Sequence, residues 1–506
     1  MRPFRKESLG KVRTKIVATV GPASSDPAVL RRMVEAGVNV FRLNFSHGTH
    51  EEHTVQLQSI RAIQEETGIQ IAVLQDLCGP KIRLGTIPGD SVACDLDAVF
   101  TIRDESGPAG DPYHLTCSHP TLPGELKLGQ SVLFADGTVA MEVIEQIPGG
   151  ARMKVTLPGL IRSHQGLNVP GGSLSVSALT EKDIHDLTWT AQHDVAYVGL
   201  SFVRRAEDVL HLRRELESRG SRARIVAKIE MHEAIANLDA IVAEADAVMV
   251  ARGDLGVEVD VTRVPALQKR IIATCREARV PVITATQMLN SMETSSRPTR
   301  AEASDVFNAV LDGTDAVMLS GETAIGAYPV EAVAVMSEVA AEAETYLFSQ
   351  DGKSEQGASV WGLAGMPAGR WYTADSPSHI ARAGKVRPVT ECVVEAASLI
   401  SRRLQAAMLA VSTKSGRTAL AISKHRNPTP TLALAHDAHT ARAMALFWGV
   451  TPLPMPDLPE RAQRRAAIIE WCKTRGMIEV GDRIVVLRGA GPSDPSHNEL
   501  VVHEVT

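Results

Sequence analysis

The residues best suited to chemistry lie in one stretch, 224–256, where two apolar runs each lead into ionisable side chains. Lys228 and Glu230 end the first run, RIVAKIE, and Arg252 and Asp254 follow the second, AVMVA. Parallel strands buried on both faces are apolar almost throughout, so charges at their C-terminal ends indicate the working face of a closed barrel. Two carboxylates beside a lysine and an arginine favour a divalent metal ion and an anionic phosphate. A salt-bridge layer closing the barrel end would have the same composition.

Glu230 and Asp254 are the predicted metal ligands. His232 stands alone near Glu230, and no set of paired Cys and His ligands accompanies either acid, which favours Mg²⁺ or Mn²⁺ over zinc. Lys228 precedes Glu230 by two residues, so both side chains point to the same face of a strand. A lysine there can neutralise a transferring phosphoryl group and a developing enolate oxygen.

Further polar residues follow other apolar runs. Arg42 suits bidentate binding of phosphate, or a structural pair with a neighbouring acid. Asn44, Ser46 and Asp76 are hard oxygen donors that suit a small cation, or else a satisfied polar cluster. Thr286 can hydrogen-bond a carboxylate or steer a proton through water, or simply favour a strand.

Eight strand-like runs separated by helical patterns must position these residues. Such alternation predicts an α/β fold, a (β/α)8 TIM barrel of parallel strands. Residues 86–168 interrupt it after the third run with many Gly, Pro and Asp, which predicts an inserted small all-β barrel domain. The strand-like runs are 14–21, 39–48, 71–85, 194–203, 224–230, 247–256, 281–288 and 316–323.

The last third of the chain predicts a separate unit. Residues 349–385 are rich in Gly, Ser, Ala and Pro and are interpreted as a linker or irregular insertion. Residues 386–506 predict an open, mostly parallel α/β sheet with an antiparallel C-terminal edge. The expected division is therefore 1–85 and 169–348 for the catalytic barrel, 86–168 for the inserted domain, 349–385 for the linker and 386–506 for a C-terminal regulatory domain.

The run STKSGRT lies between a predicted strand and a predicted helix of this C-terminal unit. Small residues before a helix N-terminus form a nest for anions, and two basic side chains add positive charge. A plain capped turn would use the same residue types. The candidate anion-binding residues are Ser412, Thr413, Lys414, Ser415, Gly416, Arg417 and Thr418.

Bulk composition excludes several classes of function. The net charge of −6 gives no general electrostatic case for nucleic acid or for an anionic membrane. No apolar run is long enough to span a bilayer, and the basic N-terminus lacks the apolar segment of a secretory signal. The six cysteines have no paired spacing, which is typical of a protein in the reducing cytoplasm.

Taken together, these stretches closely resemble pyruvate kinase. The matching segments run almost continuously from Thr14 to Pro329, and the match is weaker in the last third. They include TKIVATVGPAS, FRLNFSHG, GLNVPG, EKDIHDL, IVAKIE, MVARGDLGVE, ITATQMLNSM, the long run RPTRAEASDVFNAVLDGTDAVMLSGETAIGAYP, and TKSGRTA.

The resemblance implies transfer of phosphate from phosphoenolpyruvate to ADP, giving pyruvate and ATP in glycolysis. Glu230 and Asp254 would bind Mg²⁺, and Arg42 and Lys228 would hold the phosphoryl group. The substrate carboxylate would lie against backbone amides near Gly253 and Asp254, with Thr286. Asn44, His47 and Arg83 would bind the nucleotide. The inserted domain would close as a lid that excludes water.

One departure from the family pattern concerns the monovalent cation. The family generally binds K⁺ with residues like Asn44, Ser46, Asp76 and a following Thr, which is Leu77 here, and its usual nearby Glu is Lys81. An oxygen ligand is thus lost and a tethered positive charge is gained. Members that carry this lysine resemble K⁺-independent enzymes, so Lys81 is predicted to replace the cation and K⁺ not to be required.

The C-terminal unit departs as well. It keeps the STKSGRT loop but lacks the tryptophan-bearing loop that closes on fructose 1,6-bisphosphate in relatives. We therefore expect a monophosphate effector, a sugar monophosphate or AMP, and the resemblance implies a homotetramer.

Two other classes remain open from the sequence. One is a lyase that handles phosphoenolpyruvate or oxaloacetate without ADP. The other is a non-catalytic relative that binds phosphometabolites, although Lys228, Glu230 and Asp254 are all kept.

Overall fold

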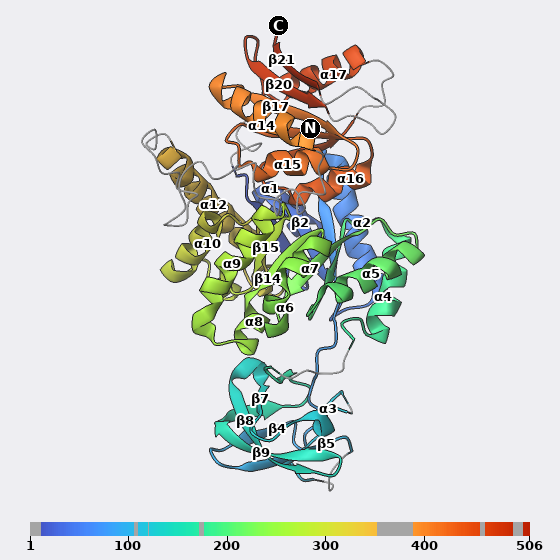
Figure 1. The fold of residues 1–506 in the computed structure, drawn as a ribbon, viewed down its shortest axis with the longest axis vertical. Helices are drawn as coiled ribbons and strands as arrows, with labels where there is room; N and C mark the ends of the chain where they lie inside the picture. Colours follow the sequence, from blue (N-terminus) through green and yellow to red (C-terminus); the bar gives the residue numbers. More distant parts are fainter. Residues whose placement is uncertain are drawn as a thin grey trace.

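The computed structural model describes residues 12–105, 110–119, 121–171, 177–351, 388–455, 461–488 and 499–506. Three units follow one another along the long axis of the molecule (Figure 1). The C-terminal unit lies at one end, the barrel in the middle and the inserted β unit at the other end. No helix in these residues combines the length and apolarity needed to cross a membrane.

The middle unit is a closed barrel of eight parallel strands, as predicted. The order around the barrel is β1-β16-β15-β14-β13-β12-β3-β2. The strands are almost wholly buried, because helices cover their outer faces. Their bounds are β1 (Lys15–Val20), β2 (Val38–Asn44), β3 (Ala72–Asp76), β12 (Tyr197–Leu200), β13 (Arg224–Ile229), β14 (Ala247–Ala251), β15 (Val282–Ala285) and β16 (Ala316–Leu319).

Helices with clear start and stop signals pack around this barrel. Thr49 caps α2 in a capping box with Glu52, and Gly68 ends that helix in a left-handed conformation. Thr180 and Thr299 cap α4 and α10 in the same way. The helices are α1 (Pro27–Ala36), α2 (His50–Thr67), α4 (Glu181–Gln192), α5 (Ala206–Ser218), α6 (His232–Ala236), α7 (Leu238–Glu244), α8 (Arg252–Glu258), α9 (Val264–Glu277), α10 (Arg300–Asp312), α11 (Gly321–Ala324) and α12 (Pro329–Asp351), with 3-10 turns η2 (Val261–Arg263) and η3 (Asn290–Glu293).

Two expected boundaries differ from the structure. The predicted run 247–256 is a strand only to Ala251, after which the chain turns directly into α8. Of the predicted linker 349–385, residues 349–351 complete α12, and 352–385 lie outside the described residues.

The insertion consists mainly of β-strands, as predicted, with one short helix, and its described strands form two sheets instead of one closed barrel. Six strands pair in the order β11-β7-β8-β9-β5-β6, and β10 pairs with β4. Its apolar residues form a core separate from that of the TIM barrel. The elements are β4 (Ser91–Cys94), β5 (Val99–Arg103), β6 (His114–Leu115), α3 (Leu122–Glu125), β7 (Ser131–Phe134), η1 (Ala135–Gly137), β8 (Val139–Ile147), β9 (Gly150–Leu157), β10 (Gly159–Arg162) and β11 (Leu167–Asn168).

The C-terminal unit is the predicted open sheet, with strand order β19-β18-β17-β20-β21. All pairs are parallel except the last, where β21 runs antiparallel to β20. The elements are α14 (Pro388–Arg403), β17 (Met408–Thr413), α15 (Arg417–Lys424), β18 (Thr431–Ala435), α16 (Ala438–Ala443), η4 (Met444–Leu446), β19 (Val450–Pro454), α17 (Arg461–Thr474), β20 (Arg483–Arg488) and β21 (Glu499–Glu504).

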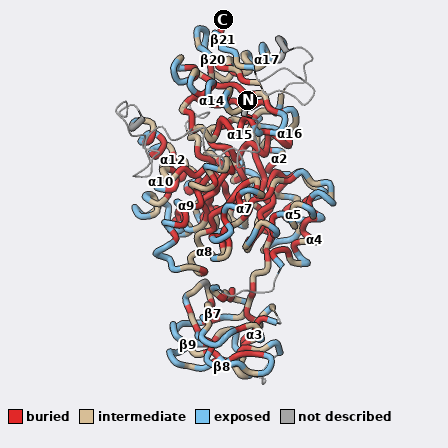
Figure 2. Tube along the Cα trace, viewed as in Figure 1, coloured by how far each residue is buried: buried red, intermediate tan, exposed pale blue. Residues whose placement is uncertain are grey.

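This C-terminal unit packs against the end of the barrel opposite the charged rim. Ala445 and Leu446 belong to the same buried cluster as the side chains that fill the barrel interior, and Tyr197 Oη donates to the carbonyl of Ala443 at 2.6 Å. Buried residues of the barrel lie next to buried residues of α15 and α16 (Figure 2).

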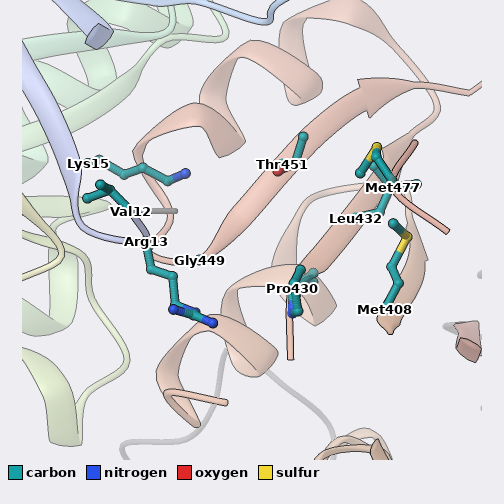
Figure 3. A pocket seen from close by; sticks show the side chains of 10 residues that line it. Val12, Arg13, Lys15, Met408, Pro430, Leu432, Gly449, Thr451 and Met477 are labelled. Carbon is teal, nitrogen blue, oxygen red and sulfur yellow. The ribbon is translucent and has the colours of Figure 1, made fainter. Parts of the chain in front are cut away.

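Polar contacts cross the same junction. Lys15 Nζ donates to the carbonyl of Val450 at 2.8 Å, and burial lowers the pKa of Lys15 to about 8. Figure 3 shows Arg13 and Lys15 beside Gly449 and Thr451 of the C-terminal unit. The C-terminal unit therefore covers the end of the barrel opposite the charged rim.

Candidate active site

Five strands of the barrel deliver the predicted residues to one rim. In the order of the barrel they are β2, β3, β13, β14 and β15, with β12 lying between β3 and β13. Arg42 and Asp76 lie at the ends of β2 and β3, and Lys228 near the end of β13. Asp254 lies in the first turn of α8 directly after β14, and Thr286 follows β15. Because parallel strands all end at the same edge, residues far apart in the chain meet here.

Lys228 lies at the centre of the cluster. Its Nζ is 2.8 Å from Glu230 Oε1 and 3.4 Å from Asp76 Oδ1, and it donates to Ser201 Oγ at 2.8 Å. The side chain of Lys228 is 11% exposed and those of the two acids are 1% exposed. Burial alone would lower the pKa of Lys228, but Asp76 and Glu230 outweigh burial and raise it. The ammonium therefore stays charged.

Asp76 is held between two cations. Arg42 Nε is 2.7 Å from Asp76 Oδ2, and Arg42 Nη1 donates to Thr19 Oγ1 at 3.1 Å. Burial would raise the pKa of Asp76, yet Lys228 and Arg42 outweigh burial and lower it. The adjacent strand, β12, can carry no side chain at position 199, since a Cβ on Gly199 would lie 2.7 Å from Asp76 Oδ1. Asp76 thus fixes Arg42 and Lys228 relative to each other.

Glu230 and Asp254 form the acidic side of the cluster. Phe202 N donates to Glu230 Oε2 at 2.8 Å, which orients the carboxylate. Burial raises the pKa of Glu230, and the charge of Asp254 raises it further against the opposing effect of Lys228. The two acids are therefore near enough to interact electrostatically.

The donor set fits a hard divalent ion. No group of three or more His, Cys, Asp or Glu side chains suited to a metal occurs among the described residues. Mg²⁺ is commonly held by one or two carboxylates, with water and substrate oxygens completing its shell. Glu230 and Asp254 would supply such a pair.

Lys81 reaches Asp254 from the loop after β3. Its Nζ lies 3.8 Å from Asp254 Oδ1, and both side chains are about one-third exposed. Gly79 N donates to Asp183 Oδ1 at 3.2 Å. Gly79 has a φ of 67°, and a Cβ there would lie 2.8 Å from Ser201 Cβ. This glycine therefore allows the loop to pass close to β12 and carry Lys81 to the rim.

Leu77 and its neighbours show how the predicted cation region is arranged. The side chain of Leu77 packs in the barrel core and offers no oxygen. Asn44 Oδ1 accepts a hydrogen bond from Ser46 N at 3.1 Å. The carbonyl of Phe45, between them, accepts from Lys182 Nζ at 2.7 Å.

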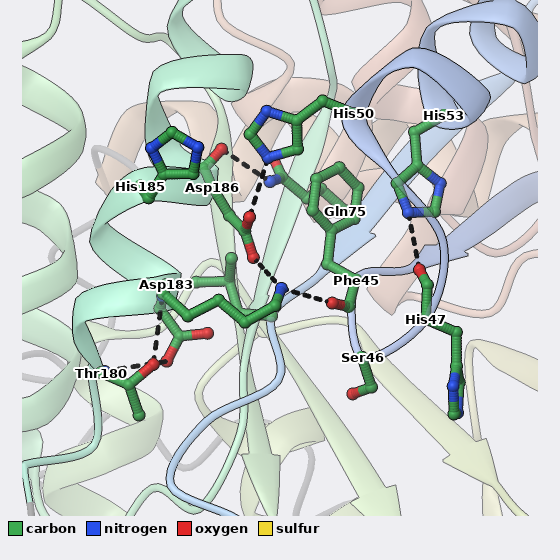
Figure 4. A network of polar contacts seen from close by, with 12 residues as sticks. Phe45, Ser46, His47, His50, His53, Gln75, Thr180, Asp183, His185 and Asp186 are labelled. Carbon is green, nitrogen blue, oxygen red and sulfur yellow. Dashed lines mark hydrogen bonds and ion pairs between the residues drawn. The ribbon is translucent and has the colours of Figure 1, made fainter.

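Lys182 was missed as a positioning group. It also contacts Asp186 Oδ2 at 2.6 Å, while His50 Nε2 lies 2.8 Å from Asp186 Oδ1. Figure 4 shows Asp186 between His50 and the lysine amine that reaches the carbonyl of Phe45, which precedes Ser46 and His47. The signal was the i, i+4 spacing of lysine and aspartate at the start of the EKDIHDL helix.

Three predicted residues lie differently from the central cluster. Arg252 turns away from it: its Nη1 lies 2.7 Å from Asp305 Oδ2 on α10, because α8 begins at Arg252 and directs that side chain outward. Arg83 lies on the connection to the inserted unit, where its Nη1 donates to the carbonyl of His164. His47 is exposed, and its carbonyl accepts from His53.

Thr286 and Gly253 are brought together as expected. Gly253 N donates to Thr286 Oγ1 at 2.7 Å, and Asp254 is the next residue. An amide and a hydroxyl thus lie beside a carboxylate at the rim.

The predicted anion loop lies between β17 and α15. Gly416, with a φ of 81°, donates its N–H to Thr413 Oγ1 at 3.0 Å, and Lys414 and Arg417 are exposed. The carbonyl of Ser415 accepts from Arg224 Nη2 at 2.9 Å, and Arg224 is the first residue of β13. The loop therefore touches the strand that carries Lys228 at its other end.

Glu258 is a buried acid that the sequence did not single out. It lies one turn after Asp254 on α8 and lines a hollow with Lys81, Asn168 and Arg204, where the inserted unit joins the barrel. Its side chain hydrogen-bonds Asn168. Burial raises the pKa of Glu258 to about 7; the hydrogen bond opposes this shift, and the charges of Glu233 and Asp254 add to it.

Comparisons with known proteins agree with this arrangement. Residues 11–333 match the family model of the pyruvate kinase barrel domain, and residues 391–503 match that of the pyruvate kinase alpha/beta domain. Pyruvate kinase 2 of Synechocystis is 39% identical over 97% of this chain and 79% of its own length. A pyruvate kinase of Agrobacterium vitis is 40% identical over 94% of this chain and 95% of its own. A crystal structure of a pyruvate kinase from Cryptosporidium parvum has a TM-score of 0.87 at 31% identity, covering 100% of this chain and 98% of that one.

We predict that Glu258 makes stability depend on pH. Its pKa is about 7 in the folded protein against an ordinary value of 4.5, so the folded state binds the proton more tightly. The stability gained from this proton is complete below about pH 4.5 and is lost as pH rises through 7. Relative to Glu258→Gln, the wild type should lose at most about 3 kcal/mol of unfolding free energy across that range.

Urea unfolding at several pH values between 4.5 and 8 measures this difference. Glu217 is exposed, so Glu217→Gln is the matched control, and its unfolding free energy should depend on pH as that of the wild type does. Parallel pH profiles for the wild type and Glu258→Gln would contradict the prediction.

Proposed function

The chain belongs to the pyruvate kinase family, and on that premise we propose that its barrel rim transfers the phosphoryl group of phosphoenolpyruvate to ADP, giving pyruvate and ATP in glycolysis. The observation that carries the proposal is the buried Lys228 ammonium, fixed by Asp76 and Glu230 beside Asp254. A fixed positive charge in a water-poor site stabilises a transferring phosphoryl group far better than a solvated one does.

Arg42 and Lys228 bind the phosphoryl group. Two of the five N–H donors of Arg42 are used by Asp76 and Thr19, which leaves donors for phosphate oxygens. Lys228 then stabilises the enolate oxygen left on the substrate. Its proton stays in place through the reaction because Asp76 and Glu230 hold it there.

Glu230 and Asp254 would hold Mg²⁺, the metal that the family generally uses, or Mn²⁺. A bound ion would supply positive charge to the phosphate oxygens and help to align donor and acceptor. Two carboxylates would leave room for substrate oxygens beside the ion.

The remaining rim residues orient the substrates. When phosphoenolpyruvate binds, the Gly253 amide and the Thr286 hydroxyl exchange their bonds to Thr286 Oγ1 and to the carbonyl of Ala285 for bonds to the substrate carboxylate, which the Asp254 amide also binds. ADP lies against Asn44, His47 and Arg83. Because Arg83 is on the connection to the inserted unit, closure of that unit, residues 86–168, brings it toward the nucleotide and excludes water.

The enzyme acts in the cytoplasm as a homotetramer. The scattered cysteines support the compartment, and the family resemblance supports the assembly.

The central prediction is that Lys228→Met lowers turnover by at least about 10²–10³-fold, since one preorganised charge stabilises the transition state by that factor. Pyruvate release from phosphoenolpyruvate is measured with and without ADP. The wild type should release pyruvate only with ADP. Lys269→Met, which removes a pair with Asp312 on the outer surface, is the control and should keep its activity.

Pyruvate release without ADP would instead support a lyase or phosphatase, and no release at all would support a binding protein.

We further propose that the Lys81 ammonium takes the place of a monovalent cation. It lies 3.8 Å from Asp254 Oδ1, and Leu77 offers no side-chain oxygen to bind K⁺. Asp76 is already neutralised by Arg42 and Lys228. A tethered positive charge at the rim needs no ion from solution.

The wild type is therefore expected to be fully active without K⁺. Lys81→Glu restores the acid that is common in the family, so this variant should lose activity without K⁺ and regain part of it when K⁺ is added. Initial rates are followed while K⁺ is titrated from zero at constant ionic strength with tetramethylammonium. Steep activation of the wild type by K⁺ would overturn this proposal.

Regulation is proposed at the loop Ser412–Thr418. Its exposed Lys414 and Arg417 suit the phosphate of a sugar monophosphate or AMP. The bond from Arg224 to Ser415 links the loop to β13, so a ligand there can bias the strand that carries Lys228.

We expect AMP or a sugar monophosphate to lower the KM of the wild type for phosphoenolpyruvate, and Lys414→Ala to abolish this response with unchanged basal kinetics. Rates are measured with each compound in turn. Lys127→Ala, an exposed lysine of the inserted unit, should still respond. Equal responses in the wild type and Lys414→Ala would show that the effector binds elsewhere.

A further inference from the structure

The turn after β15 has an unusual backbone. Thr286 and the next residue, Gln287, have φ values of 66° and 53°, both in the left-handed region. A β-branched residue such as threonine is a true outlier there. Each such residue costs on the order of 1–3 kcal/mol and persists only when its surroundings hold it in place. Something in the structure must therefore hold this turn.

Arg252 is the side chain that does so. Its Nη2 donates to the carbonyl of Thr286 at 2.7 Å and to that of Gln287 at 3.4 Å, and its Nε donates to the carbonyl of Ala285 at 3.3 Å. One guanidinium thus binds three consecutive carbonyls across the turn. A planar fork with five donors can do this, whereas a lysine ammonium cannot.

The guanidinium is itself fixed from the outer helices. Its Nη1 lies 2.7 Å from Asp305 Oδ2 on α10 and 3.3 Å from Gln268 Oε1 on α9. The side chain of Arg252 is only 10% exposed. Two helices therefore hold Arg252, and Arg252 holds the turn.

The turn in turn fixes the Thr286 hydroxyl. Its Oγ1 accepts from Gly253 N at 2.7 Å and donates to the carbonyl of Ala285 at 2.6 Å. Gly253 directly follows Arg252 and precedes Asp254. Arg252 is therefore the first residue of the helix that carries Asp254, and its side chain holds the turn that faces this helix.

We propose that Arg252 is a positioning residue that sets the Thr286 hydroxyl against the Gly253 amide by clamping the left-handed turn. It does not touch substrate, and it acts only through Thr286. The inference rests on the proposed role of Thr286 in binding the substrate carboxylate and steering a proton.

A double-mutant cycle tests whether the effect passes through Thr286. In the wild-type background, Arg252→Lys should lower kcat/KM for phosphoenolpyruvate by about 10–100-fold, the effect expected of a misplaced group at a reacting centre. In a Thr286→Ala background the same change should cost less than about twofold, because the group it positions is gone. The KM for ADP should stay unchanged in all variants.

Two further variants separate positioning from general damage. Arg213→Lys is the matched control: Arg213 also pairs with an acid, Asp246, and donates to a carbonyl, that of Glu244, but on the outside of the barrel. It should leave the kinetics unchanged. Asp305→Asn weakens the ion pair that holds Arg252 and is a milder change, since the Asp305 side chain is 37% exposed. If Arg252→Lys does not fold, Asp305→Asn replaces it in the double-mutant cycle.

An equal loss in both backgrounds, or no loss in the wild-type background, would overturn the proposal. A wild type that releases no pyruvate would instead overturn the proposed function, and that is seen before any variant is made.

Discussion

The interaction on which the structure depends is the burial of the Lys228 ammonium among carboxylates. A charge removed from water costs several kcal/mol unless it is paired with good geometry. Asp76 and Glu230 provide that geometry at 3.4 and 2.8 Å, and they come from different strands. Removing either acid would leave an uncompensated buried charge. The cluster is therefore stable only when the barrel is closed and in register.

This requirement explains features far from the rim. Gly199 must lack a side chain because a Cβ there would collide with the Asp76 carboxylate. The opposite end of the barrel must be sealed, and Leu446 and its neighbours in the C-terminal unit complete the interior packing. The C-terminal unit is thus part of the barrel's core as well as the carrier of the anion loop. A ligand at that loop acts on a unit that already shares buried surface with the catalytic strands.

Sequence patterns predicted the fold well because each pattern has one dominant physical cause. Strands buried on both faces are continuous apolar runs, so the eight barrel strands could be placed before the structure was known. The charges that end those runs located the rim, since parallel strands share one edge. Strand ends were less certain. The change from β14 to α8 at Arg252 is not visible as a break in polarity, because ARGDLG carries the charges of either a strand end or a helix start.

Side-chain direction was the part that the sequence could not supply. Arg252 and Asp254 are two residues apart, and on a strand they would point the same way. On a helix, two residues correspond to about 200° of rotation, so the arginine turns out to Asp305 while the aspartate stays at the rim. The same geometry that removes Arg252 from the substrate places it behind the Thr286 turn. Because both residues lie on the short helix α8, Asp254 faces the proposed reaction site and Arg252 supports the backbone of the Thr286 turn.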